Sequence, residues 1–221
     1  MTDIIEAIES LFIIRKDCYP MQMDNKNDYR VIKKPLTRDL IEQHLKGDIT
    51  IGCYQANPIT KNVKWVCFDF DGVIEDEFEK AKRLFFRLKN NEMNPLMEFS
   101  GRRGYHIWLF IEPTKIDIAR AFVLEWSKDN GVADVYPRND KIGHNGYGSQ
   151  VKMPLGMHRV SWKRSFLFDD NLNILSQRNS EKLLIEIADN KRDLISIIDE
   201  RNLLKDFIKK KIKGKLKRQM E

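Results

Sequence analysis

The sequence predicts an α+β fold centred on a split β-α-β-β-α-β unit, in which both helices cover one face of a four-stranded sheet. Three observations predict it. Strand-like and helix-like segments alternate in this order across residues 63–137. Two strand-like segments follow each other directly within 96–111, which favours a hairpin. The chain has 221 residues, of which 42% are apolar, enough to form a substantial core.

A smaller α/β part is expected ahead of this unit. Residues 3–14 (DIIEAIESLFII) have the spacing of an amphipathic helix, whereas 15–35 are polar and are interpreted as a loop. A second helix follows Thr37, a residue type that caps helix N-termini, and ends before Gly47. The segment ITIGCY (49–54) predicts a strand.

Six elements make up the central unit. Its strands are rich in β-branched and aromatic residues, and Pro137 stops the last of them. Each helix has one apolar face, and the first begins with an acidic turn, which suits a helix N-terminus. The expected strands are 63–70, 96–100, 105–111 and 133–137, and the expected helices are 75–91 and 115–131.

The remaining segments have weaker patterns. After the central unit we expect a polar, glycine-containing loop at 138–149, short strands at 150–154, 165–168 and 173–175, and helices within 180–213.

Charge is unevenly distributed along the chain. The formal net charge is +6, which by itself favours nucleic-acid binding. Residues 201–221 carry a net +7, however, so residues 1–200 are close to neutral. The basic tail 203–219 suits template phosphates, an anionic surface or a solvated helix end. A functional argument for the main body therefore depends on specific residues.

Composition also excludes several classes of protein. The apolar content is too high for a disordered chain, and no apolar run approaches the ~20 residues of a membrane span. The acidic N-terminus differs from a secretory signal. Cys18, Cys53 and Cys67 form no C-x-x-C pair, so we expect neither a cysteine zinc site nor disulfides. A cytoplasmic protein without membrane contact is the expectation.

Strand alternation places acidic residues together on the sheet face away from the helices. The first and third strands of a split unit are central, and the fourth lies beside the first. Asp69 and Asp71, His106, and Asp134 then converge from three neighbouring strands. Ionised aspartates this close repel each other, which Mg²⁺ or Mn²⁺ relieves. Acids that end a solvated sheet edge are the alternative interpretation.

Two basic segments suit phosphate. In SGRRGYH (100–106) the glycines let the backbone approach an anion and the arginines neutralise it. In KMPLGMHR (152–159) a lysine and a histidine leave a strand together, with Lys163 and Arg164 behind them. An ordinary hairpin turn and a basic surface loop are the alternatives.

Together these motifs resemble those of the archaeo-eukaryotic primase superfamily over about residues 63–160. WVCFDFD resembles the family's hhhDhD strand, SGRRGYH its Ser…His motif, VADVYP its hydrophobic-Asp strand, and KMPLGMHR its basic strand exit. The lead-in PLTRDLIEQHLKGDITIGCY (35–54) is similar to that of prokaryotic primase-polymerases of the CRISPR-associated and conflict-system type.

The resemblance implies a DNA primase-polymerase, a template-dependent nucleotidyltransferase that synthesises primers and extends them on single-stranded DNA. NTPs and dNTPs are the implied substrates, with two divalent ions, Mg²⁺ or Mn²⁺, as cofactors. CRISPR or mobile-element proteins are implied partners. The implied domains are 1–62 (N-terminal part of the catalytic module), 63–178 (RRM-like core) and 179–221 (helical, basic C-terminal segment).

Residue roles follow from the motif positions. The implied metal-binding and catalytic residues are Asp69, Asp71 and Asp134. The implied nucleotide-binding residues are Ser100, Arg103, Gly104, His106, Lys152 and His158. Further expected nucleic-acid contacts are Arg102, Arg159, Lys163 and Arg164.

Other functions fit parts of the pattern. FDFDGVI resembles the nucleophile loop of haloacid-dehalogenase-type phosphatases, with Thr114, Lys152 and Asp169–Asp170 as weaker partners, and predicts a parallel sheet. A non-enzymatic RRM-like module would read bases with aromatics such as Trp108 and Tyr136. An end-joining repair polymerase shares the three acidic and histidine motifs.

Overall fold

The computed structural model describes residues 2–128, 131–132, 134–143 and 146–190. Its helices are α1 (Ile4–Phe12), α2 (Arg38–Lys46), α3 (Ile74–Lys89), α4 (Ile116–Trp126) and α5 (Gln177–Asp189). Its strands are β1 (Tyr19–Gln22), β2 (Tyr29–Ile32), β3 (Gly52–Tyr54), β4 (Asn62–Asp71), β5 (Leu96–Phe99), β6 (Gly104–Lys115), β7 (Asp134–Tyr136), β8 (Gln150–Lys152) and β9 (Phe166–Leu167).

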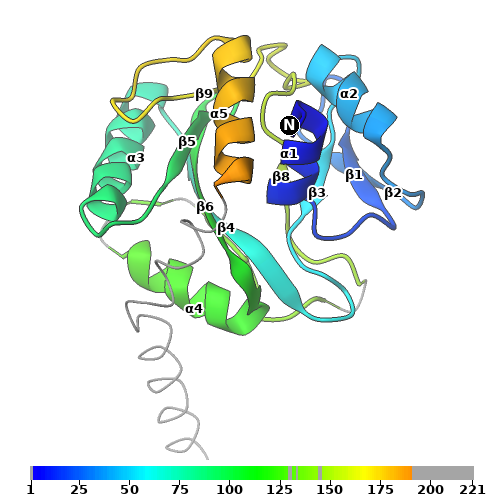
Figure 1. The fold of residues 1–221 in the computed structure, drawn as a ribbon, viewed down its shortest axis with the longest axis horizontal. Coiled ribbons are helices and arrows are strands. Elements are labelled where there is room, and N and C mark those ends of the chain that lie inside the picture. Colours follow the sequence, from blue (N-terminus) through cyan, green and yellow to red (C-terminus); the bar gives the residue numbers. More distant parts are fainter. Residues whose placement is uncertain (1, 129–130, 133, 144–145, 191–221) are drawn as a thin grey trace, which may run out of the picture.

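The main sheet has the strand order β7-β4-β6-β5-β9, with every neighbouring pair antiparallel. The predicted split unit is therefore confirmed, with β4 and β6 in the centre and β7 beside β4 (Figure 1). Strand β9 extends the sheet beyond the four expected strands. The antiparallel order also excludes the parallel sheet of a haloacid-dehalogenase-type phosphatase, so that alternative is wrong.

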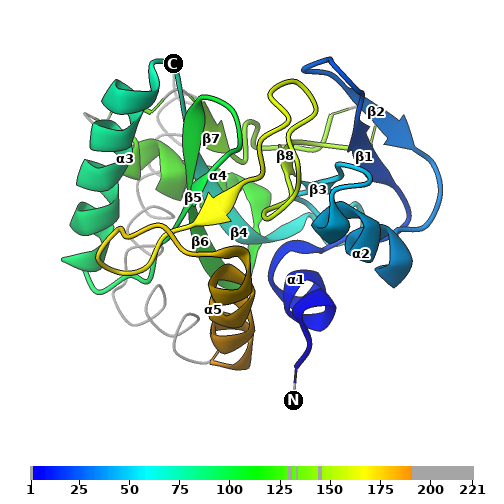
Figure 2. The ribbon, with the colours of Figure 1, turned by 90° about the horizontal axis from the view of Figure 1, so that it is seen from above.

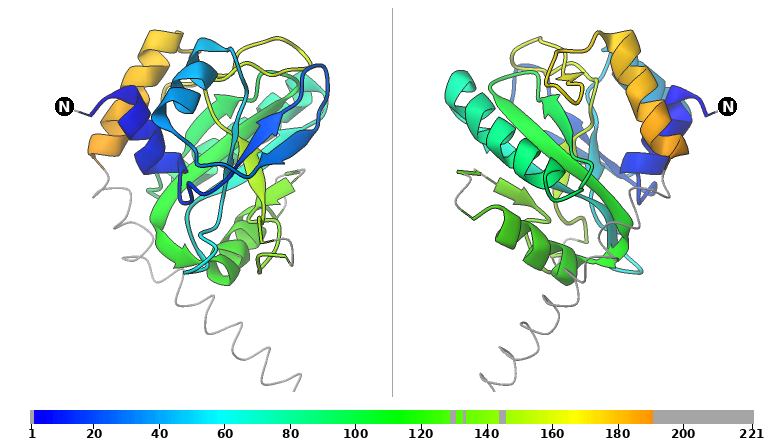
Figure 3. Two further views of the ribbon diagram at one scale, coloured as in Figure 1. Left: turned by 90° about the vertical axis from the view of Figure 1, so that its right-hand side faces the viewer. Right: turned by 60° about the vertical axis from the view of Figure 1, so that its left-hand side comes forward.

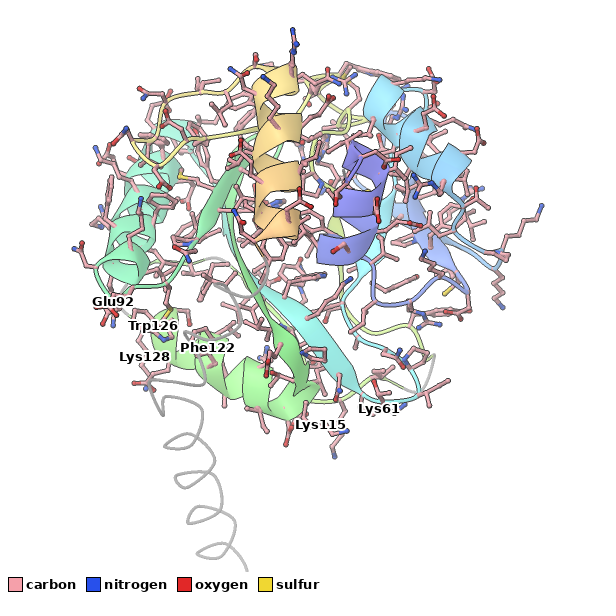
Figure 4. The ribbon with its side chains drawn as sticks, in the orientation of Figure 1. Lys61, Glu92, Lys115, Phe122, Trp126 and Lys128 are labelled. Carbon is pink, nitrogen blue, oxygen red and sulfur yellow. The ribbon has the colours of Figure 1, made fainter. Side chains whose placement is uncertain are left out.

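Helices α3 and α4 cover one face of this sheet, as expected (Figure 3, right). The side chains of Val66, Phe68 and Phe70 alternate out of β4 into a hydrophobic cluster with the apolar faces of these two helices. Lys61 and Lys115 lie close together where β4 begins and β6 ends (Figure 4). Phe122 and Trp126 lie on the buried side of α4.

The opposite face of the sheet is also covered, which the sequence pattern did not predict. Helices α1 and α5 lie side by side against it (Figures 1 and 3). Trp65 and Trp108 are fully buried there, and the Trp65 indole nitrogen donates a hydrogen bond to the Phe12 carbonyl at 2.9 Å. The end of this face that carries the acidic residues lines a cavity instead. Because Trp108 is buried, it is unavailable for stacking on a base, which removes one of the two aromatic residues named for the RRM-like module.

The segment expected to be a loop, 15–35, instead contains the antiparallel hairpin β1–β2. Strand β3 pairs with β8 in a second small sheet, which lies between the hairpin and the main sheet (Figure 2). Each strand of this hairpin has only four residues, the first contains Pro20, and the connection between them is polar, so the strand signal is weak. Residues 173–175 form only an isolated bridge, Phe168 to Ile174.

Helix α2 has the predicted ends and buries a histidine. Thr37 accepts a hydrogen bond from the Leu40 amide at the N-terminus, and Gly47 ends the helix at φ +97°. His44 is fully buried; its Nδ1 accepts from the Ile51 amide at 3.1 Å, so Nε2 carries the proton donated to the Pro154 carbonyl, also at 3.1 Å. This ring thus links α2 to the segment that follows β8.

Helix α5 confirms the first part of the helical expectation for 180–213. The rest of that segment and the basic tail 203–219 lie outside the described residues. A hydrophobic cluster combines side chains from α1, α2, the main sheet and α5. Among the described residues, no helix has the length and apolar character needed to cross a membrane.

His44 should make the fold sensitive to acid. Burial lowers the pKa of His44 to about 3, whereas the unfolded chain titrates near ~6.5. The contribution of neutral His44 to the free energy of unfolding is fully present above about pH 6.5. It decreases as the pH falls, by at most about 1.4 kcal/mol per pH unit. In urea unfolding from pH 7 to 4, His44→Gln should flatten the stability profile relative to wild type. Identical profiles would contradict this role.

Gly156 should be essential for seating this histidine. A Cβ added at Gly156 would lie 1.9 Å from His44 Cε1. Gly156→Ala should therefore lower the free energy of unfolding by about 2 kcal/mol or more, because the ring has no space to move. The same substitution in a His44→Ala background should cost much less, which a double-mutant cycle by chemical denaturation would measure. Equal costs in both backgrounds would show that the clash is relieved elsewhere.

Candidate active site

A cavity of about 540 Å³ opens at the uncovered end of the main sheet, between it and the small β3–β8 sheet. The volume is in the range of small-molecule sites. It brings together nine of the residues that the sequence singled out: Asp69, Asp71, Ser100, Arg102, Arg103, Gly104, His106, Lys152 and His158. The other lining residues are Asn27, Tyr29, Tyr136, Arg138, Asn139, Gly148, Ser149, Gln150 and Val151.

The strand register positions the acidic residues. On β4, Asp69 pairs with His106 of β6 on one side and with Asp134 of β7 on the other. His106 Nε2 lies 3.7 Å from Asp69 Oδ1. Burial raises the pKa of Asp69, although His106 opposes this. The expected convergence from three strands is therefore found, with Asp134 at the side of the cavity and not in its lining.

The two outer carboxylates are paired with arginines. Arg103 binds Asp71 with two hydrogen bonds, from Nε at 2.6 Å and from Nη2 at 2.9 Å. Arg138 forms an ion pair with Asp134, and its guanidinium lies 5.0 Å from the centre of the Tyr136 ring. Each acid of the cluster therefore has a basic neighbour, which offsets the repulsion between carboxylates.

The SGRRG loop is held close to its neighbours. A Cβ at Gly104 would lie 2.2 Å from the Phe70 carbonyl oxygen, so the start of β6 can approach β4 only as glycine. Gly101 has φ +93° and lies against the backbone of Lys163. The Ser100 amide bonds the Gly104 carbonyl at 2.9 Å. This tight turn directs Arg102 and Arg103 to the cavity.

Behind the cavity lies Glu98, a fully buried carboxylate that the sequence argument missed. Its Oε2 is 2.9 Å from His106 Nδ1 and accepts a 2.9 Å hydrogen bond from Trp108 Nε1. A carboxylate only accepts, so His106 Nδ1 carries the proton. Burial by itself would raise the pKa of Glu98, but Lys152 and His106 outweigh it and lower that pKa. One charged residue within the apolar strand LMEF was the available signal.

Lys152 reaches the same carboxylate from the other sheet. Its Nζ lies 3.6 Å from Glu98 Oε1 and donates 3.0 Å hydrogen bonds to the Met153 carbonyl and to Ser165 Oγ. Burial lowers the pKa of Lys152, and Glu98 opposes that effect. For His106, burial would also lower the pKa, but Glu98 and Asp69 together outweigh burial and raise it.

His158 faces the cavity as a neutral ring. Burial, followed by the nearby charges of Lys152 and Arg102, lowers the pKa of His158 to about 4. Its Nδ1 accepts a 3.2 Å hydrogen bond from the Val160 amide, so Nε2 carries the proton. The imidazole is thus a hydrogen-bond donor at neutral pH.

The other basic residues of this region lie away from the cavity lining. Arg159 is buried and bonds the Gly47 carbonyl at 2.8 Å, and Arg164 donates to the carbonyls of Leu45 and Lys46 at the end of α2. Both hold the fold together through these contacts. Lys163 is exposed on the adjoining loop.

The carboxylates have the donor chemistry that Mg²⁺ or Mn²⁺ prefers. Asp69 and Asp71 are two residues apart on one strand, and Asp134 is the register partner of Asp69. Among the described residues, no three His, Cys, Asp or Glu side chains are already close enough to enclose one ion. The residue types therefore suit such ions. In the structure, however, Asp71 and Asp134 form ion pairs with Arg103 and Arg138.

This sheet, with a polar cavity at its open end, is the arrangement that the resemblance to primase-like nucleotidyltransferases led us to expect. A model of the archaeo-eukaryotic primase domain of the TOTE conflict system matches residues 3–196, and the chain belongs to this family. The resemblance to this superfamily and to its conflict-system members is confirmed. A comparison with curated proteins found no match.

Three solved structures have distant similarity to this chain. The primase-polymerase domain of cyanophage S-2L is 9% identical and covers 76% of this chain and 89% of its own, with a TM-score of 0.45. The polymerase domain of ligase D from Mycobacterium tuberculosis is 14% identical, covering 80% and 72%, with a TM-score of 0.42. Primase RepB′ is 9% identical, covering 97% and 69%, with a TM-score of 0.45.

Asp69 should be a residue whose charge costs stability. Its pKa is raised by burial, so its ionised form disfavours the folded state at neutral pH. Asp69→Asn should therefore raise the free energy of unfolding, measured by urea denaturation at pH 7 in EDTA. Glu112→Gln, on the exposed end of β6, is the matched control and should change nothing. A less stable Asp69→Asn would show that the carboxylate is structural.

Proposed function

We propose that this chain is a DNA primase-polymerase that synthesises primers and extends them on single-stranded DNA. The observation that carries the proposal is a single cavity lined by acidic residues of β4 and by cationic side chains of the SGRRG loop and β8. A nucleoside triphosphate with divalent cations needs both charges within a few ångströms of each other.

In this proposal Asp69, Asp71 and Asp134 hold two divalent cations, Mg²⁺ or Mn²⁺. When bound, such ions stabilise the charge on the attacking and leaving oxygens of nucleotidyl transfer. For this role the ion pairs Asp71–Arg103 and Asp134–Arg138 must break, so that both carboxylates can bind the cations. The arginines then become available for phosphate oxygens, which their planar fork binds well.

The cationic side of the cavity receives the triphosphate. His106 and Lys152 approach from β6 and β8, and neutral His158 offers a hydrogen-bond donor. Ser100 and the backbone at Gly104 border the same space. This placement aligns the α-phosphate for attack by a primer 3′-hydroxyl; the new P–O bond forms as the bond to pyrophosphate breaks.

The template strand has a proposed path along Arg102, which is half-buried and lines the cavity, and Lys163, which is exposed on the adjoining loop. Arg159 and Arg164 are left out of this path, because backbone carbonyls occupy their guanidinium groups. Arg138, which the sequence argument did not consider, replaces them as a candidate at the cavity.

The test is a priming assay on unprimed single-stranded DNA with labelled NTPs and dNTPs, in Mg²⁺ or Mn²⁺. Wild type should form metal-dependent products, and Asp69→Ala/Asp71→Ala should lose at least about 100-fold of the rate, because the developing charge is no longer stabilised. Glu112→Gln is the matched acidic control and should retain activity.

Three results would each change the conclusion. Absence of any metal-dependent product from wild type would refute the proposal. Extension only of a supplied primer would replace priming by repair-type polymerisation. Unchanged activity in the double aspartate variant would move the active site elsewhere.

A further inference from the structure

Glu98 lies outside the cavity lining, yet it contacts two residues that form it. Its position on β5 is between His106 of the neighbouring strand and Lys152 of the small sheet. The carboxylate divides its oxygens between them: Oε2 receives the hydrogen bonds of His106 and Trp108, and Oε1 faces Lys152. A single buried group thus connects His106 and Lys152, which come from separate sheets.

The contact with Lys152 is electrostatic. Glu98 Oε1 is buried and has no hydrogen-bond partner among the residues that the structure describes. The Lys152 ammonium lies 3.6 Å away and donates hydrogen bonds to Met153 and Ser165. The ammonium therefore has a buried counter-charge behind it and the cavity in front of it. Such a contact holds the charge near the opening without closing its coordination.

Stability alone is a poor explanation for a carboxylate at this position. Desolvating it is costly, and buried ionic groups are often replaced by apolar residues of similar volume without loss of stability. The surroundings on this face are otherwise apolar, since Trp65, Trp108 and Leu96 belong to one cluster. The negative charge of Glu98 is explained if His106 and Lys152, the two side chains it contacts, have a function at the cavity.

We propose that Glu98 is a positioning residue for His106 and Lys152, the side chains that bind phosphate in the proposed function, on which this inference rests. From behind the cavity it fixes the His106 ring through Nδ1, so that Nε2 faces Asp69 and the opening. It also holds the Lys152 side chain toward the same opening. A polyphosphate then meets two side chains that are already oriented, which saves the entropy of ordering them.

A double-mutant cycle tests the link between Glu98 and Lys152. Glu98→Gln keeps the shape and one acceptor but removes the charge, and Lys152→Met removes the ammonium. Calorimetry with inorganic tripolyphosphate, dATP and adenosine measures binding without turnover. Each single variant should weaken tripolyphosphate and dATP binding at least about 10-fold and leave adenosine unchanged. The double variant should be little worse than either single one.

Trp108→Phe is the matched structural control. This substitution removes the other hydrogen bond to Glu98 Oε2, so it should lower the melting temperature. It leaves His106 and Lys152 in contact with Glu98, so the affinity for tripolyphosphate should stay within about twofold of wild type. Glu98→Asp keeps the charge but withdraws it by one methylene, so its affinity should lie between those of wild type and Glu98→Gln. In the priming assay, Glu98→Gln should raise the nucleotide KM more than it lowers kcat.

The outcomes separate the two proposals. A wild type that binds tripolyphosphate, with Glu98→Gln binding it equally well, would overturn the positioning role and leave the proposed function intact. Additive losses in the cycle would also overturn it. A wild type that binds neither tripolyphosphate nor dATP would instead refute the proposed function, and the role of Glu98 with it. If Glu98→Gln does not fold, Glu98→Asp and Lys152→Met decide by the same criterion.

Discussion

The structure depends on the register of β4 between β6 and β7. Because side chains alternate along a strand, this one alignment sends Val66, Phe68 and Phe70 into the helix-covered core and turns Asp69 to the other face. It also places His106 and Asp134 directly beside Asp69. A slip by one residue would bury the carboxylates and expose the phenylalanines, so the fold and the site share one constraint.

A second constraint is that charge leaves water only with a partner. Glu98 is the buried case, since it lies between His106 and Lys152, whereas Asp71 and Asp134 are more exposed and pair with Arg103 and Arg138 at the cavity. The near-neutral charge of residues 1–200 is therefore the sum of opposite charges arranged locally. This arrangement gives a polar cavity that a triphosphate and its cations can enter by exchange of ionic partners.

Much of the fold and of the site could be predicted because local patterns determine them. The period of the apolar residues predicted β4, β6, α3 and α4, and alternation predicted which face carries Asp69 and His106. The hairpin β1–β2 could not be predicted, because its strands are only four residues long, the first contains Pro20, and its position beside the cavity depends on contacts between β1 and β3. The covered sheet face was missed because amphipathic α1 and α5 do not reveal which surface they bury.

Local sequence patterns were enough to predict the order of the elements in the central unit, the burial of its alternating apolar residues and the acidic and basic motifs typical of the primase superfamily. The tertiary structure alone decided which of these charges meet. Glu98 became a partner of Lys152 because two sheets pack together, whereas Arg159 and Arg164 were drawn to backbone carbonyls of α2 and its cap. The physical reason is that the sequence shows which residues are charged, whereas the partner of each charge depends on packing between segments far apart in the chain.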